Sequence, residues 1–228
     1  MANNIFKLVL GKLFSLSETR EQAALDLAAE MRYAQSPGLR GAGEMLGRDV
    51  PRLPGKLYLL VDVSGSMQDA MAQRGDVRYL DLAALFAAAT LKRNSAAEVV
   101  AYSDEVIECT LGREDVMGNA QKLANLEGGG TKCVTPLKAL NKRWARGDLV
   151  VYISDNQGRP NAATLAEWDR FKSRNKRAKL ACIDIQPRVG VQGNEREDVL
   201  CLSGFGAEQF DRVVRFAEGR LEPAYSAA

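Results

Sequence analysis

From residue 55 onward, short apolar runs alternate with amphipathic stretches. Residues 57–63 are apolar without any polar alternation, which is typical of a strand buried on both faces of a parallel sheet. Residues 79–92 carry a wide apolar face at helical spacing. Further strands are predicted over residues 98–102, 106–111, 149–154, 180–185 and 199–202, and further helices over residues 114–126, 135–144, 165–174 and 207–217. This alternation predicts an α/β fold in which helices cover a mainly parallel sheet.

One pair of these strands must be antiparallel. Only Ser103, Asp104 and Glu105 separate the strand at 98–102 from the strand at 106–111, and three residues cannot hold a crossover helix. The other strands are separated by segments long enough for a crossover. The prediction is therefore a doubly wound, Rossmann-like sheet of six strands, five of them parallel and one an antiparallel edge strand.

The first 50 residues have a different pattern. Apolar residues recur at helical spacing over residues 5–16, and a capping-box sequence at the start of residues 19–33 predicts a second helix. Residues 37–55 are interrupted by glycine and proline, as in a linker. The chain is thus expected to divide into a short helical extension with its linker, residues 1–50, and an α/β domain, residues 51–228.

The composition narrows the class of protein. Hydrophobic residues make up 46% of the 228 residues and charged residues 26%, as in soluble globular proteins. The net charge of +2 excludes a basic surface extending over the whole chain. No histidine is present, which rules out Ser-His-Asp catalysis and histidine-containing zinc sites. Neither a signal peptide nor a membrane span is indicated, and the four cysteines form no Cys-x-x-Cys pair, so a cytoplasmic location without membrane contact is expected.

Polar residues collect where the predicted strands end. Five of them, from three separate loops, are Asp62, Ser64, Ser66, Thr131 and Asp155. Because ligand sites of doubly wound sheets lie beyond the carboxyl ends of the strands, these side chains are expected to meet. Two carboxylates and three hydroxyls suit Mg²⁺ or Mn²⁺ and leave a position for an incoming oxygen. The competing interpretation is that the two serines only cap the following turn.

These motifs resemble the metal-ion-dependent adhesion site of von Willebrand factor A-type domains, over about residues 55–220. Residues 99–105, 129–133, 154–156 and 201–205 are similar to stretches of the C-terminal A-type domain of Ro autoantigen (TROVE) proteins. The resemblance implies that the five polar residues hold the cation, directly or through water. It also implies a non-enzymatic module that binds an Asp or Glu of a protein partner through the metal. Lys132 departs from the family, which has an acidic residue there.

Two alternatives remain open. The first is a subunit of a Ro-like RNA-binding or RNA-processing ribonucleoprotein. Ro proteins bind RNA with a ring of helical repeats that residues 1–50 are too short to form, so RNA contact is expected to be indirect. A basic run is the candidate for direct phosphate contact: Lys172, Arg174, Lys176, Arg177 and Lys179. No aromatic residue is interleaved for base stacking, and a solvated helix end explains the run equally.

The second alternative is a metal-dependent hydrolase with Asp69 or Asp184 as the base. Other chemistry-bearing residues have simpler interpretations. Trp144 and Trp168 are expected to pack on helices. Cys133, two residues after Thr131, is expected to be a small buried hydrophobe rather than a reactive thiol.

Overall fold

The structure is a computed structural model that describes Ala28 and residues 50–71, 74–113, 115–155, 160–186, 193–204 and 207–220. The predicted helices and linker of residues 1–50 lie outside the described residues, with the exception of Ala28 and Val50. Both of these side chains are buried against the core of the α/β domain.

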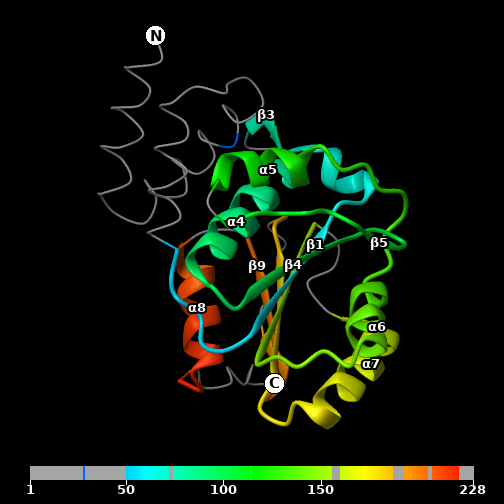
Figure 1. Cartoon of the computed structure of the whole chain (residues 1–228), viewed down its shortest axis with the longest axis vertical. Coiled ribbons are helices and arrows are strands. Elements are labelled where there is room, and N and C mark those ends of the chain that lie inside the picture. Colours follow the sequence, from blue (N-terminus) through cyan, green and yellow to red (C-terminus); the bar gives the residue numbers. More distant parts are fainter. Residues whose placement is uncertain are drawn as a thin grey trace.

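Within the described residues, seven strands form one sheet in the order β5-β4-β1-β6-β7-β9-β8. Figure 1 labels β1, β4, β5 and β9 of this sheet. Their bounds are β1 (Leu57–Asp62), β4 (Ala97–Tyr102), β5 (Val106–Ile107), β6 (Leu149–Ser154), β7 (Lys179–Asp184), β8 (Gly193–Arg196) and β9 (Val199–Ser203). Strands β4, β1, β6, β7 and β9 are parallel, and β5 pairs antiparallel with β4. The predicted doubly wound sheet with an antiparallel edge strand is confirmed.

The predicted number of six strands has to be corrected. Strand β8 adds a seventh at the other edge of the sheet, antiparallel to β9. A separate two-stranded ribbon, β2 (Ala70–Met71) with β3 (Arg74–Arg78), precedes the first long helix. Both β8 and β3 are polar and contain glycine, so neither has the apolar run or alternation that identifies a strand in a sequence.

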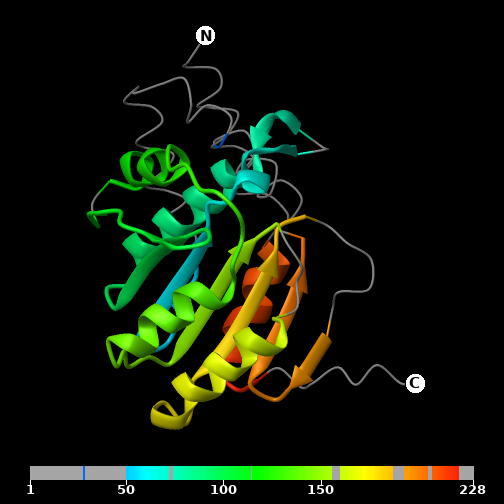
Figure 2. The same ribbon diagram turned by 90° about the vertical axis from the view of Figure 1, so that its right-hand side faces the viewer.

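Helices cover both faces of the sheet (Figure 2). They are α4 (Tyr79–Arg93), α5 (Val116–Ala124), α6 (Val134–Lys142), α7 (Ala162–Arg174) and α8 (Ala207–Ala217). Alternate residues of β1 face the two layers: Leu59 packs in the core beneath α4, α5 and α8, whereas Leu60 packs in the core beneath α6 and α7. Because both faces of β1 are covered, every residue of the strand is buried, as its uninterrupted apolar sequence predicts.

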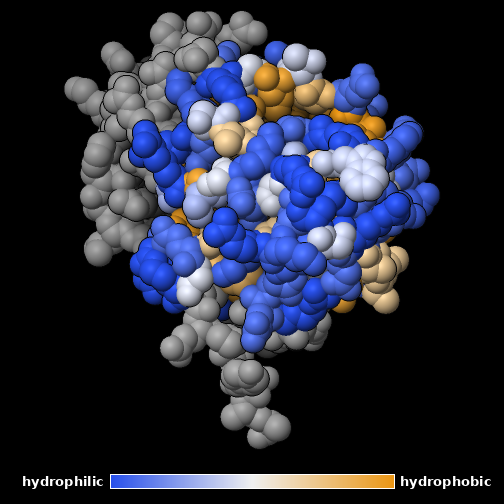
Figure 3. Space-filling model, turned by 60° about the horizontal axis from the view of Figure 1, so that its bottom comes forward, coloured by the Kyte–Doolittle hydropathy of each residue, from blue (hydrophilic) through white to orange (hydrophobic). Residues whose placement is uncertain are grey.

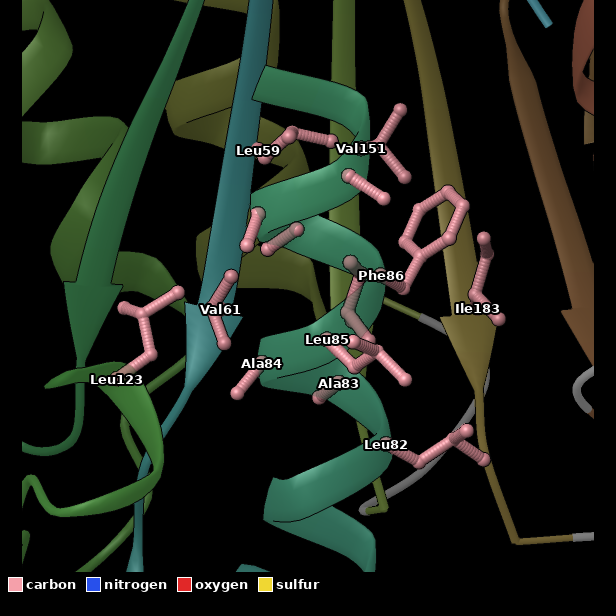
Figure 4. Packing of buried hydrophobic residues seen from close by; sticks show 14 of the residues in the cluster. Leu59, Val61, Leu82, Ala83, Ala84, Leu85, Phe86, Leu123, Val151 and Ile183 are labelled. Carbon is pink, nitrogen blue, oxygen red and sulfur yellow. The ribbon is translucent and has the colours of Figure 1, made fainter. Parts of the chain in front are cut away.

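Helix α4 is buried along almost its whole length between the sheet and α5. Leu85 and Phe86 lie over Val151 and Ile183 of the neighbouring strands (Figure 4). A run of alanines in the middle of the helix presents little side-chain volume, which allows close packing on both sides. No helix in the described parts of the chain combines the length and the apolar character that crossing a membrane requires.

The two tryptophans have opposite surroundings. Trp168 is fully buried and stacks on Phe171, so the prediction that it packs on a helix is confirmed. Trp144 lies just beyond α6 with 76% of its surface exposed, so the same prediction is wrong for this residue.

The β8–β9 hairpin is tied to α7 by Asp198. Its carboxylate accepts hydrogen bonds from Trp168 Nε1 at 2.9 Å and Arg196 Nε at 2.9 Å, and it forms an ion pair with Lys172 at 3.2 Å. Burial alone would raise the pKa of Asp198, but the hydrogen bonds from Arg196, Trp168 and Lys172 outweigh it and lower the pKa below its ordinary value. The charged form is therefore stabilised in the folded state.

We expect Asp198→Asn to lower the free energy of unfolding by about 1–3 kcal/mol at neutral pH, because it removes charge-assisted hydrogen bonds. The folded-state pKa of Asp198 lies below its unfolded value, so its contribution is present above the ordinary carboxyl pKa and is lost as the pH falls through the lowered folded-state pKa. Urea unfolding of both proteins across the acid range should show the difference shrinking below about pH 4. Asp169→Asn is the control, because its exposed pair with Arg196 should contribute less than about 1 kcal/mol. A difference that persists unchanged in acid would contradict this account.

Candidate metal centre

The ends of β1 and β6 bring the first and last of the predicted ligands to one edge of the sheet. The two strands are parallel neighbours, with Val61 opposite Ile153. Asp62, the last residue of β1, therefore lies beside Ser154, the last residue of β6, and Asp155 follows immediately. The parallel register of the two strands therefore places Asp62 and Asp155 at the same end of the sheet, as their positions in the sequence predict.

Asp62 is a fully buried carboxylate. Its Oδ2 accepts a hydrogen bond from Ser154 Oγ at 2.6 Å, and its Oδ1 accepts one from the backbone N–H of Ser64 at 2.9 Å. Burial raises the pKa of Asp62, and the hydrogen bonds from Ser154 and Ser64 offset this only in part. No cationic side chain in the described part of the chain pairs with it.

A chain of hydroxyls connects Asp62 to Asp155. Ser64 Oγ lies 3.3 Å from Ser66 Oγ, and Ser66 Oγ donates to Asp155 Oδ1 at 3.0 Å. Ser64 and Asp155 are buried, whereas Ser66, in the short 3₁₀ helix η1 (Gly65–Gln68), is partly exposed. The structure therefore brings four of the five predicted residues into one connected cluster whose outer member is Ser66.

The loop that carries Thr131 is fastened beside this cluster through its backbone. The N–H of Gly65 donates to Gly129 O at 3.0 Å, and the N–H of Lys132 donates to Ser103 O at 3.0 Å. Thr131 lies between Gly129 and Lys132 in the chain and is partly exposed. Within the described residues, its hydroxyl makes no hydrogen bond to the other four predicted ligands. Lys132 follows Thr131 directly and is exposed, so it places a positive charge beside this loop.

The loop has no room for a side chain at Gly128. A Cβ at this position would lie 2.4 Å from the carbonyl oxygen of Val63 and 2.7 Å from Cβ of Ser103. At Gly130, by contrast, a Cβ would meet nothing within 4 Å. Only the first glycine of the run is required for the loop to contact the end of β1.

The donor set fits a hard divalent cation. In the portions that the structure describes, no group of three or more Asp, Glu, His or Cys side chains is placed to hold a metal, so a cation here depends on hydroxyl oxygens as well as on Asp62 and Asp155. A buried carboxylate that lacks a cationic partner is costly, and a divalent ion beside it would compensate its charge. Oxygen ligands of this kind are those that Mg²⁺ and Mn²⁺ prefer.

Ser154 is the member of the cluster that the sequence did not reveal. Its hydroxyl orients Asp62, yet a serine at the end of an apolar strand carries no distinctive signal other than its position before Asp155.

The two carboxylates considered for a hydrolase differ in their burial. Asp69 is exposed, and Asp184 is buried at the end of β7, where its Oδ1 accepts from the N–H of Gln186 at 3.1 Å. Cys133 is only partly buried, not fully buried as predicted, but burial still raises the pKa of its thiol.

The basic run is divided by the fold. Lys172 is held by Asp198 and by the carbonyl of Ala178, and Lys179 by the carbonyl of Phe216. Arg174 bonds to the carbonyl of Arg170 and to Asn141. Lys176 and Arg177 are exposed in the turn between α7 and β7. Three of the five cations therefore have structural contacts, and two face solvent.

A doubly wound sheet with an Asp-x-Ser-x-Ser loop after β1 is the arrangement typical of a von Willebrand factor A-type domain. Residues 56–216 match the family model of the Ro60 vWA domain, and the chain belongs to this family. Among solved structures, the Ro (RSR) protein of Deinococcus radiodurans is similar in fold, with a TM-score of 0.68 at 18% sequence identity. That match covers 96% of this chain but only 48% of the Deinococcus protein, so the chain spans about half of its length. No curated protein sequence matches the chain.

We expect Gly128→Ala to destabilise the domain by about 1–3 kcal/mol, because its Cβ would overlap the backbone of Val63. Gly130→Ala, the matched control two residues away, should change the free energy of unfolding by less than about 0.5 kcal/mol. Chemical denaturation of the two variants and the wild type measures both values. Equal stabilities for the two variants would show that the loop does not need its close approach to β1.

Proposed function

We propose that this chain is the metal-dependent interaction module of a Ro-like ribonucleoprotein assembly. The observation that carries the proposal is the buried Asp62 carboxylate, connected through Ser64 and Ser66 to Asp155, in a chain whose residues 56–216 belong to the Ro60 vWA family. Family membership favours the ribonucleoprotein context, and the geometry of the cluster favours a metal-dependent contact within it.

The residues proposed to hold the cation are Asp62, Ser64, Ser66, Thr131 and Asp155, with Mg²⁺ or Mn²⁺ as the ion. Two carboxylates balance the charge of a divalent cation, while the hydroxyls add none. The bound cation would then attract a further oxygen ligand, which we assign to an Asp or Glu of a protein partner. Ser66 is the partly exposed end of the cluster and marks the side from which we propose that this carboxylate approaches.

The proposed module is not catalytic. The chain contains no histidine, and the spare carboxylate of Asp184 already accepts a backbone hydrogen bond. We place RNA in the assembly rather than on the metal centre. All four cysteines are free thiols, which accords with the proposed cytoplasmic location.

Metal binding predicts a change in stability that does not require the partner. At free Mg²⁺ about 100-fold above Kd, the wild type should gain about 2.7 kcal/mol in unfolding free energy. Asp62→Asn keeps the shape of the side chain but removes its charge, so we expect stability close to the wild type in EDTA and no gain from Mg²⁺. Denaturation of both proteins with EDTA, Mg²⁺ and Mn²⁺ provides the test. An equal gain in the variant would show that the cation binds elsewhere.

The assembly is tested by affinity capture of the tagged chain from its native lysate in Mg²⁺ and in EDTA, with sequencing of bound RNA and identification of bound proteins. We expect one protein and its RNA to be retained together in Mg²⁺ and released by EDTA. Ser66→Ala should lose them, whereas Ser103→Ala, which removes a hydroxyl bonded to Asp104 instead, should retain them. Capture that is identical with EDTA and with Ser66→Ala would rule out a role for the metal, and a partner without RNA would rule out the ribonucleoprotein.

A further inference from the structure

Trp144 occupies a backbone position that normally belongs to glycine. Its φ of 54° makes it the one non-glycine residue with positive φ among those described. The N–H of Trp144 donates to Asn141 O at 3.1 Å, and the N–H of Ala145 donates to Leu140 O at 2.9 Å. These are the two hydrogen bonds of a Schellman motif, whose left-handed residue is usually glycine because a side chain there is strained. A large aromatic residue is thus kept, mostly exposed, where it costs stability.

One cation lies over this side chain, and others line a hollow that begins two residues further along the chain. The Arg174 guanidinium lies over the Trp144 ring, 5.8 Å from its centre. Arg146 donates to the carbonyl of Arg174, and the Gly147 N–H donates to Asn175 Oδ1 at 3.2 Å, so the turns after α6 and α7 are bound together. Arg146 also lines a hollow of ≈ 480 Å³ with Lys176 and Arg177.

The acidic residues nearby are mostly committed to other contacts. Glu98 pairs with Lys56 and Arg143, and the Asp148 carboxylate in the same hollow accepts from the backbone N–H of Lys56. Glu167 accepts from Asn141 and lies 4.0 Å from Arg170. Within the described residues, no ion pair is formed by the four cations Arg146, Arg174, Lys176 and Arg177. The patch therefore combines an exposed aromatic ring with a surplus of positive charge.

We propose that this patch, formed by Trp144, Arg146, Arg174, Lys176 and Arg177, binds single-stranded nucleic acid. A base stacks on the exposed ring of Trp144, over which the Arg174 guanidinium also lies, and phosphates occupy the hollow lined by Arg146, Lys176 and Arg177. Exposed aromatic rings next to basic grooves bind single strands in this way and tolerate any base. The exposed ring of Trp144, the Arg174 guanidinium over it and the cations of the hollow together favour a planar, negatively charged ligand.

The patch lies at the amino ends of the parallel strands, whereas the metal centre lies at their carboxyl ends. Residues 143–148 and 175–178 precede β6 and β7, whereas Asp62 and Asp155 follow β1 and β6. The edge on which the patch lies, at the bottom of Figure 1, comes forward in Figure 3 and is mainly hydrophilic. Six residues of a strand extend roughly 20 Å, so the two sites do not share residues or ligands. The inference therefore goes beyond the proposed function and stands independently of it.

Trp144 itself reports binding, because the chain has only two tryptophans and Trp168 is fully buried. Titration of the full chain with an oligouridylate of about 12 nucleotides should quench the exposed tryptophan in a saturable way. Trp144→Gly removes the ring and the backbone strain, so we expect it to fold with an unchanged or higher melting temperature and to bind at least about tenfold more weakly, measured by anisotropy of labelled RNA.

Lys176→Ala with Arg177→Ala should reduce the dependence of affinity on salt, by roughly 0.7 in the logarithmic slope for each phosphate that is no longer neutralised. The control is Lys122→Ala, which removes an exposed cation outside both the patch and the metal centre and should leave binding unchanged. Oligothymidylate identifies whether DNA is bound equally, and either result supports a stacking site. Polyphosphate competes for the cations but should not quench Trp144.

The proposal would be overturned by no quenching with either oligonucleotide, by equal affinity of the folded Trp144→Gly variant, or by equal quenching by polyphosphate. Asp62→Asn in EDTA separates this site from the metal centre. Binding that survives in that variant supports a separate nucleic-acid site even if the metal-dependent partner is not found. Binding that is abolished in a folded Asp62→Asn variant would assign the nucleic acid to the metal centre instead.

Discussion

The buried negative charge of Asp62 is the constraint on which this edge of the domain depends. Strand β1 is covered by a helical layer on each face, and this covering removes its last carboxylate from water. Ser154 and the Ser64 backbone each donate one hydrogen bond to it, which leaves its charge only partly compensated. Ser66 donates to Asp155 nearby, and Gly128 packs closely against Val63, the residue after Asp62. The same packing that stabilises the domain therefore leaves a buried carboxylate, whose charge we propose is balanced by a divalent cation.

Most of the sheet could be predicted from the sequence because its strands are buried on both faces. Burial on both faces demands continuous apolar runs, and these are visible in β1, β6 and β7 without any knowledge of the partners. Strand β8 could not be found in this way, because its own sequence is polar. It lies at an edge of the sheet and pairs with β9 through its backbone. Trp144 was misassigned because helical spacing places it on the face of α6, whereas the helix ends at Lys142 and the chain turns it outward.

The candidate site was predictable where backbone topology determines position. Parallel strands bring their carboxyl ends to one edge, so Asp62, Ser64, Ser66 and Asp155 meet as their spacing indicates. The hydroxyl of Thr131 and the contribution of Ser154 depend on side-chain orientation, which spacing does not specify. The basic run shows the same limit, because neighbours in sequence face different ways. Lys172 bonds to Asp198, while Lys176 is exposed beside a turn that starts more than 25 residues earlier in the chain.

Strands β1 and β6 run from one edge of the domain to the other, side by side in parallel register and buried throughout. Because protein interiors of this kind are densely packed, the distance between the two ends cannot vary by more than a small fraction of its length. The domain consequently fixes the distance between its two ends. Any two molecules that it holds at opposite edges have a separation and a relative orientation set by six residues of extended backbone, regardless of how tightly either one binds.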